Sequence, residues 1–131
     1  MSMIPTNKIL IIDDEEMMRL ILRKYLSMVG YDVHEASTTK TALDLIKKIN
    51  FDIAIVDIHM PQMSGEELII QAKTIDPKIQ FIIHTGTPEY AVSEQLKSLG
   101  IVQANVLVKP VEDMYTFQTT IQRLIDRRHH A

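Results

Sequence analysis

Five polar side chains in this 131-residue chain stand at the ends of short apolar runs: Asp13, Asp14, Asp57, Thr85 and Lys109. If the runs are parallel strands of one sheet, their carboxyl ends meet at one edge, which is where open α/β sheets bind ligands. Carboxylates this close together raise one another's pKa unless a cation lies between them. Oxygen ligands without His or Cys favour Mg²⁺, and ammonium and hydroxyl donors suit phosphoryl oxygens. The pattern therefore predicts a magnesium and phosphoryl site.

The rest of the chain predicts the elements that must bring these side chains together. Short β-branched runs alternate with longer segments of helical period, which indicates βα units around a parallel sheet. Asp32, His34 and Glu35 make the second run polar, so we expect it at an edge of the sheet. The expected strands are 9–12, 31–36, 53–56, 79–83 and 106–108, and the expected helices carry 18–29, 38–49, 68–75, 88–99 and 117–124.

Composition excludes several classes of protein. The chain has no cysteine, which rules out a disulfide scaffold, a Cys-based zinc site and a thiol nucleophile. Its net charge of -3, with no basic run, argues against direct binding of nucleic acid. No apolar stretch approaches the ~20 residues needed to span a bilayer, and Met1 to Asn7 lacks the features of a signal peptide. We expect a cytoplasmic, single-domain protein that does not bind membranes.

The motifs at the strand ends resemble one known family, the response-regulator receiver domains of two-component signalling, which includes the chemotaxis regulator CheY. The resemblance covers about residues 8–127 and implies an α/β fold whose five-stranded parallel sheet has the order 2-1-3-4-5 and is flanked by five helices. We expect a receiver domain at 8–128, with tails at 1–7 and 129–131. The motifs are Ile11-Ile12-Asp13-Asp14-Glu15, Asp57-Ile58-His59-Met60-Pro61-Gln62-Met63-Ser64-Gly65, Thr85-Gly86 and Lys109-Pro110.

The resemblance implies a phosphoacceptor and a metal site. Asp57 matches the carboxylate that takes a phosphoryl group from a sensor histidine kinase or a histidine phosphotransfer protein. Mg²⁺ is the implied cofactor. Asp14 and Asp57 match its direct ligands, Asp13 matches a ligand through water, and His59 matches the position that offers only its backbone carbonyl.

The resemblance also assigns roles at the other strand ends. Lys109 matches the lysine that pairs with a phosphoryl oxygen, and Thr85 matches the hydroxyl that binds another such oxygen and moves on activation. Gly65 is expected to permit a sharp turn after Asp57. The bond between Lys109 and Pro110 is expected to be cis.

The implied function is a phosphorylation-dependent switch with an unknown downstream effector and a possible phosphorylation-dependent dimer. Its chemistry would be limited to self-catalysed phosphotransfer and autodephosphorylation. Two positions depart from the usual pattern and concern how the signal is read out. Val106 stands where many relatives have an aromatic residue, and Gly86 stands where alanine is common. His59 and Thr87 match positions that flank the route of the attacking water.

Other functions fit less well. A haloacid-dehalogenase-type phosphatase would carry its nucleophile after the first strand, whereas Asp57 follows the third. A flavodoxin-like FMN site would be repelled by Asp13 and its acidic neighbours, and a scaffold without chemistry would not need Asp57, Thr85 and Lys109. A receiver excised from a longer regulator or hybrid kinase stays open. The remaining histidines have no ligand spacing and are interpreted as structural or exposed: His34, His84, His129 and His130.

Overall fold

The computed structural model describes residues 6–129, and its strands form a single five-stranded parallel sheet in the order β2-β1-β3-β4-β5. This confirms the predicted fold class and the edge position of the polar strand. The strands are β1 Lys8–Ile12, β2 Asp32–Ala36, β3 Ile53–Val56, β4 Gln80–Thr85 and β5 Val106–Val108. The helices are α1 Glu16–Val29, α2 Thr39–Lys48, α3 Gly65–Ile75, α4 Glu94–Ser98, the short 3₁₀ helix η1 Gln103–Asn105, and α5 Tyr115–His129.

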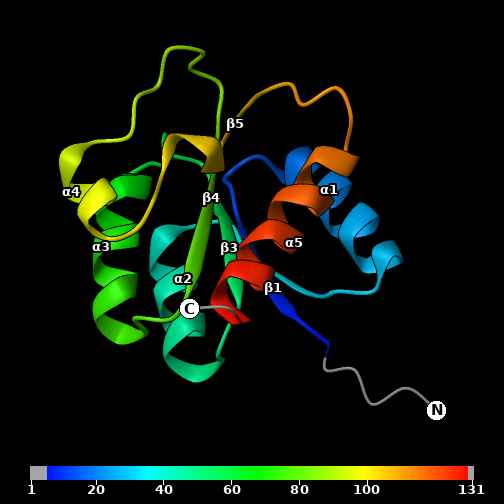
Figure 1. Ribbon diagram of the computed structural model, residues 1–131, viewed down its shortest axis with the longest axis horizontal. Coiled ribbons are helices and arrows are strands. Elements are labelled where there is room, and N and C mark those ends of the chain that lie inside the picture. The colour runs from blue at the N-terminus through cyan, green and yellow to red at the C-terminus, as the bar shows by residue number, and fades with distance from the viewer. Residues whose placement is uncertain (1–5, 130–131) are drawn as a thin grey trace.

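The sheet lies between two helical layers, with α1 and α5 on one face and α2, α3 and α4 on the other (Figure 1). Each face has its own apolar core. Ile9 and Ile11 of β1 pack with the α1 and α5 side, while Leu10 and Ile12 pack with the α2 and α3 side. A strand covered on both faces must be apolar at every position. The continuous runs of Ile and Val in β1 and β3 are therefore what places these strands in the centre.

The helix boundaries follow local chemistry. Thr38, Ser64 and Ser93 each cap a helix by accepting a hydrogen bond from the backbone N–H three residues further on. Gly30 ends α1 in the left-handed region, with φ of 118°. Asp76 ends α3 just before Pro77, as the sequence predicts. No helix in residues 6–129 is long and apolar enough to cross a membrane.

The fourth helix differs from the expectation. The sequence predicts a helix from Pro88 to Leu99, but α4 begins only at Glu94. The side-chain amide of Gln103 donates to the Tyr90 carbonyl (2.8 Å) and accepts from the Val92 N–H (3.0 Å). These backbone groups are therefore satisfied outside a helix. The residues between β4 and α4 form a long loop above the sheet (Figure 1).

The edge strand β2 carries a histidine in an ordinary environment. Nε2 of His34 lies 3.3 Å from Oδ1 of Asp32, and its ring packs edge to face on Phe51 with the ring centroids 5.4 Å apart. The sequence-based interpretation of His34 as structural or exposed fits this half-buried position. His130 lies outside the described residues.

Candidate functional site

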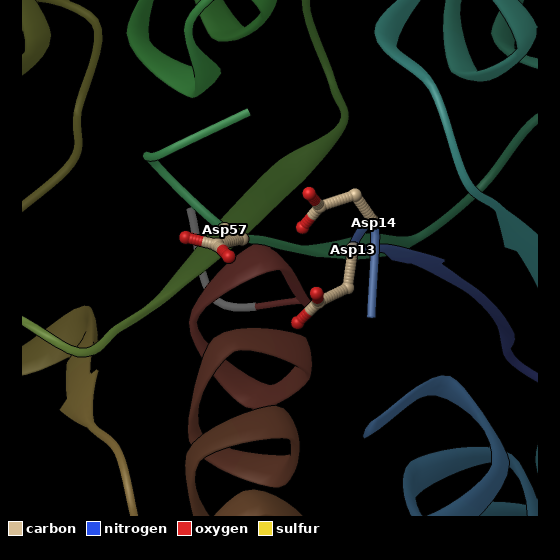
Figure 2. A group of neighbouring side chains, drawn as sticks. All are labelled: Asp13, Asp14 and Asp57. Carbon is tan, nitrogen blue, oxygen red and sulfur yellow. The ribbon is translucent and has the colours of Figure 1, made fainter. Parts of the chain in front are cut away.

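Three carboxylates meet at the carboxyl ends of β1 and β3. Asp13, Asp14 and Asp57 each place an oxygen within 4.8 Å of the oxygens offered by the other two. Figure 2 shows the Asp13 and Asp14 side chains reaching from the end of β1 toward Asp57. Asp13 and Asp57 are buried, whereas Asp14 is exposed to solvent. The arrangement is a set of hard oxygen ligands with one side open, which suits Mg²⁺.

The sheet itself fixes the two buried carboxylates. The Asp13 N–H donates to the Ala36 carbonyl (3.2 Å), and the Asp57 N–H donates to the Ile12 carbonyl (3.0 Å). Each carboxylate also accepts a hydrogen bond from the backbone two residues further on. Oδ1 of Asp13 accepts from the Glu15 N–H, and Oδ1 of Asp57 accepts from the His59 N–H, both at 2.9 Å. One oxygen of each group is thus committed to the backbone, and the other points into the site.

Lys109 reaches the same space from the end of β5. Its Nζ lies 3.0 Å from Oδ2 of Asp13, 3.1 Å from Oε1 of Glu15 and 3.2 Å from Oδ2 of Asp57. The ammonium therefore offsets the mutual repulsion of the acids. The peptide bond between Lys109 and Pro110 is cis, as the sequence predicts.

The ionisation of the site reflects burial opposed by this cation. Burial raises the pKa of Asp13 above its ordinary value, although the Glu15 N–H and the Lys109 ammonium act in the opposite direction. Burial lowers the pKa of Lys109, but the bonds to Asp13 and Glu15 outweigh it, so the pKa rises above its usual range. Lys109 therefore stays protonated, whereas burial makes the ionised form of Asp13 less favourable than it is in water.

Two hydroxyls and one imidazole connect the loops above the site. Thr85 is fully buried, and its Oγ1 accepts the Thr87 N–H at 3.2 Å. Nε2 of His59 lies 2.8 Å from Oγ1 of Thr87, which joins the loop after β3 to the loop after β4. The structure thus places all the predicted site residues at the carboxyl-terminal end of the sheet.

Comparison with known proteins identifies the family. Residues 9–122 match the model of the response regulator receiver domain. The chain belongs to this family.

Two curated relatives and one solved structure illustrate the match. The chain is similar to sporulation initiation phosphotransferase F of Bacillus subtilis (34% identity, covering 71% of this chain and 75% of the relative). It is also similar to regulatory protein AtoC of Escherichia coli (29% identity, 91% of this chain), of which it spans only 25%. A CheY-like receiver domain from Methanospirillum hungatei superposes with a TM-score of 0.81 (25% identity), covering 96% of this chain and 98% of that one.

In this receiver domain Gly65 has a role that differs from the one predicted. Its backbone is not in the left-handed region, which the loop reaches instead at Gln62 with φ of 70°. A Cβ at Gly65 would lie 2.6 Å from the Asp57 carbonyl oxygen and 2.8 Å from Cα of Ile58. Glycine is therefore required because α3 begins directly against the backbone that carries Asp57.

The sequence did not predict the involvement of two residues near the site. Glu15 stands in the first motif without an assigned role, yet its carboxylate lies 3.1 Å from the Lys109 ammonium. His84 is buried beneath the site and packs on Phe117. A polar residue in an otherwise apolar run next to Thr85 is the signal that could have drawn attention to it.

Proposed function

We propose that this receiver domain is a phosphorylation-dependent signalling switch that accepts a phosphoryl group on Asp57. The observation that carries the proposal is the position of the Asp57 carboxylate. It is buried, it lies beside the Asp13 and Asp14 oxygens, and its Oδ2 is 3.2 Å from the Lys109 ammonium. A nucleophilic carboxylate thus has a metal-binding pair on one side and a fixed cation on the other.

The residues present fit a magnesium ion. Asp14 and Asp57 would bind it directly, Asp13 through a water, and His59 through its backbone carbonyl. The open side at Asp14 leaves room for the waters and the phosphoryl oxygen that Mg²⁺ retains in protein sites. When bound, the ion supplies the positive charge that lets a phosphoryl group approach these carboxylates.

The residues of the chain divide the chemistry between them. An Asp57 oxygen attacks the phosphorus of a phosphohistidine, a P–O bond forms, the P–N bond breaks, and its electron pair stays on the donor's ring nitrogen. Lys109 then transfers one contact from Asp57 to a phosphoryl oxygen. The Thr85 hydroxyl, which now accepts from its own loop, turns to donate to a second oxygen. The movement of Thr85 is the step that carries the signal into β4.

The partners follow from this chemistry. We propose that the donor is a sensor histidine kinase or a histidine phosphotransfer protein in the cytoplasm. The phosphorylated form then binds a downstream protein or pairs with a second copy. The chain's own chemistry ends with transfer to Asp57 and hydrolysis of the acyl phosphate, without turnover of a further substrate.

Phosphorylation by a small donor tests the proposal. Acetyl phosphate with Mg²⁺ should add one phosphate to the chain by intact mass, and omission of the metal should prevent it. Asp57→Asn should take up none. Asp44→Asn, which changes an exposed acid on α2, is the matched control and should be labelled like the wild type. Full labelling of Asp57→Asn would disprove the assignment.

A further inference from the structure

His84 is a buried polar residue that the proposed chemistry does not use. It lies on β4 directly before Thr85 and is 2% exposed. Neither Nδ1 nor Nε2 has a hydrogen-bond partner among the described residues. The ring packs edge to face on Phe117 of α5, with the centroids 5.0 Å apart. An apolar side chain would fill this position without burying unpaired polar atoms.

The unpaired nitrogens raise the energy of this conformation. A neutral imidazole always carries one N–H donor and one acceptor nitrogen. Burying a donor without an acceptor forfeits its hydrogen bonds to water and gives nothing in return. Native proteins rarely leave such groups unpaired, and one that persists requires a reason, such as strain stored at a functional or switch site.

The position of His84 connects it to the phosphoacceptor. Val56 pairs with Ile83 across β3 and β4, so the next residues, Asp57 and His84, are neighbours on the same face of the sheet. Burial is the main reason that the pKa of His84 falls to about 4, and the Lys109 charge lowers it further while the Asp57 charge opposes this. The imidazole is therefore uncharged near neutral pH and can act only through a hydrogen bond.

We propose that His84 is a positioning residue of the switch, whose ring N–H gains an acceptor oxygen on phosphorylated Asp57. This inference rests on the proposed function. The movement that brings the Thr85 hydroxyl to a phosphoryl oxygen also shifts the adjoining residue on the same strand. The new hydrogen bond is made in only one of two conformations, so it favours that conformation.

Beryllofluoride binding in the presence of Mg²⁺ tests the energetic consequence. His84→Leu should bind this phosphoryl mimic about fivefold more weakly than the wild type, the factor that one hydrogen bond supplies. Its affinity for Mg²⁺ alone should not change. His34→Leu is the matched control, because His34 also packs edge to face on a phenylalanine but lies on the edge strand away from Asp57, and its beryllofluoride affinity should stay at the wild-type value. Equal affinities for His84→Leu and the wild type would overturn the proposal.

The imidazole resonances of the unmodified chain test the bond directly and do not depend on a variant that folds. Beryllofluoride should move the His84 ring N–H proton downfield and slow its exchange with water, while the His34 ring is unaffected. If the Thr85 amide shifts but the His84 ring resonances do not, the inference is wrong and the proposed function stands. If wild type does not bind the mimic at all, both fail.

Discussion

Lys109 and the acids around it determine how stable the unphosphorylated site is. Its ammonium bonds to Asp13, Glu15 and Asp57 at once, at 3.0 to 3.2 Å. A lysine that contacts three carboxylates cannot offset all their charge. A divalent ion is the natural addition, because it supplies a second centre of positive charge beside the same oxygens.

Neutralising Asp13 should stabilise the metal-free protein. Burial holds the pKa of Asp13 above its unfolded value, so its contribution to stability is present when it is protonated at low pH and is lost as the pH rises through the folded pKa. Asp13→Asn should therefore raise the free energy of unfolding at pH 7, because the buried position no longer holds an ionised carboxylate. Urea titration without Mg²⁺ measures this. The gain should vanish below pH 4, and a gain that is constant with pH would contradict the electrostatic cause.

The two acids of the pair should contribute unequally to metal binding. Asp14 is exposed and not hydrogen-bonded to the backbone or to Lys109 in the described structure, whereas Asp13 is committed to the Glu15 N–H and Lys109. Asp14→Asn should weaken Mg²⁺ binding more than Asp13→Asn does, because it removes a direct ligand; even partners that act through another group cost about 10- to 100-fold in affinity when they are removed. Isothermal titration compares the two. Equal losses would show that both carboxylates contact the ion.

The buried imidazole predicts a loss of stability in acid. The unfolded chain binds a proton near the ordinary histidine pKa of 6.5, but His84 in the folded chain does so only near 4. Its contribution is therefore present above pH 6.5 and is lost as the pH falls toward 4, amounting to about 3 kcal/mol. His84→Leu should lose less stability than the wild type over this range in thermal or urea unfolding. Parallel pH curves for the two proteins would contradict this account.

At the scale of secondary-structure elements, the loop between β4 and α4 is the part most directly linked to the site. Thr87 is bonded to His59, the Tyr90 hydroxyl donates to Glu66 of α3 at 3.0 Å, and Gln103 holds the Tyr90 and Val92 backbone groups. The loop after β3, helix α3 and helix η1 therefore all hold this one loop, and we expect a movement at Thr85 to strain at least one of these hydrogen bonds.

The bridge between the two loops should control the lifetime of the acyl phosphate. The His59 ring and the Thr87 hydroxyl join the two loops at 2.8 Å, and we expect this bridge to restrict the approach of water to Asp57. Thr87→Val keeps the shape but removes the bond, and it should speed dephosphorylation severalfold, consistent with the loss of about 1 kcal/mol. Decay of phosphate measured by mass spectrometry tests this. Thr119→Val on the exposed side of α5 is the control, and a Thr87→Val rate equal to the wild-type rate would contradict the idea.

How much was predictable also differs between elements. The strands could be predicted because burial on both faces demands continuous Ile and Val runs, and the polar residues of β2 marked the edge. The start of α4 could not, because a side chain ten residues or more away in the sequence, Gln103, satisfies the backbone of the loop. The positions of five site residues could be predicted because each stands at the end of a strand: Asp13, Asp14, Asp57, Thr85 and Lys109. The closeness of Gly65 to the Asp57 backbone is a tertiary contact that no local pattern encodes, and the only local signal for the burial of His84 is its place in the apolar run of β4.

At the scale of the whole molecule, the proposed switch requires that a signal from Asp57 reach a surface through one of the two helical layers. Val106 lies at the start of β5 and packs, half-buried, against the core shared with α2, α3 and α4. Its short, stiff side chain gains little area by rotating. Tyr90 packs against the same core and is linked by its hydroxyl to α3. This aromatic residue on the loop is therefore better placed than Val106 to pass movement to the surface.

Removing the Tyr90 hydroxyl should shift the switch before any phosphorylation. Burial and the Glu66 carboxylate raise the Tyr90 pKa, so the hydroxyl stays protonated and donates at neutral pH. Tyr90→Phe deletes this tie, and the loss of about 1 kcal/mol should raise the population of the displaced loop about fivefold. The backbone amides of 86–93 should then lie part of the way toward their beryllofluoride-bound positions in NMR spectra of the free protein. Tyr115→Phe, at an exposed position on α5, should leave them unchanged.

Val106→Ala should preserve the full response to beryllofluoride. If Val106→Ala abolishes that response while Tyr90→Phe behaves as wild type, the signal passes through β5 instead.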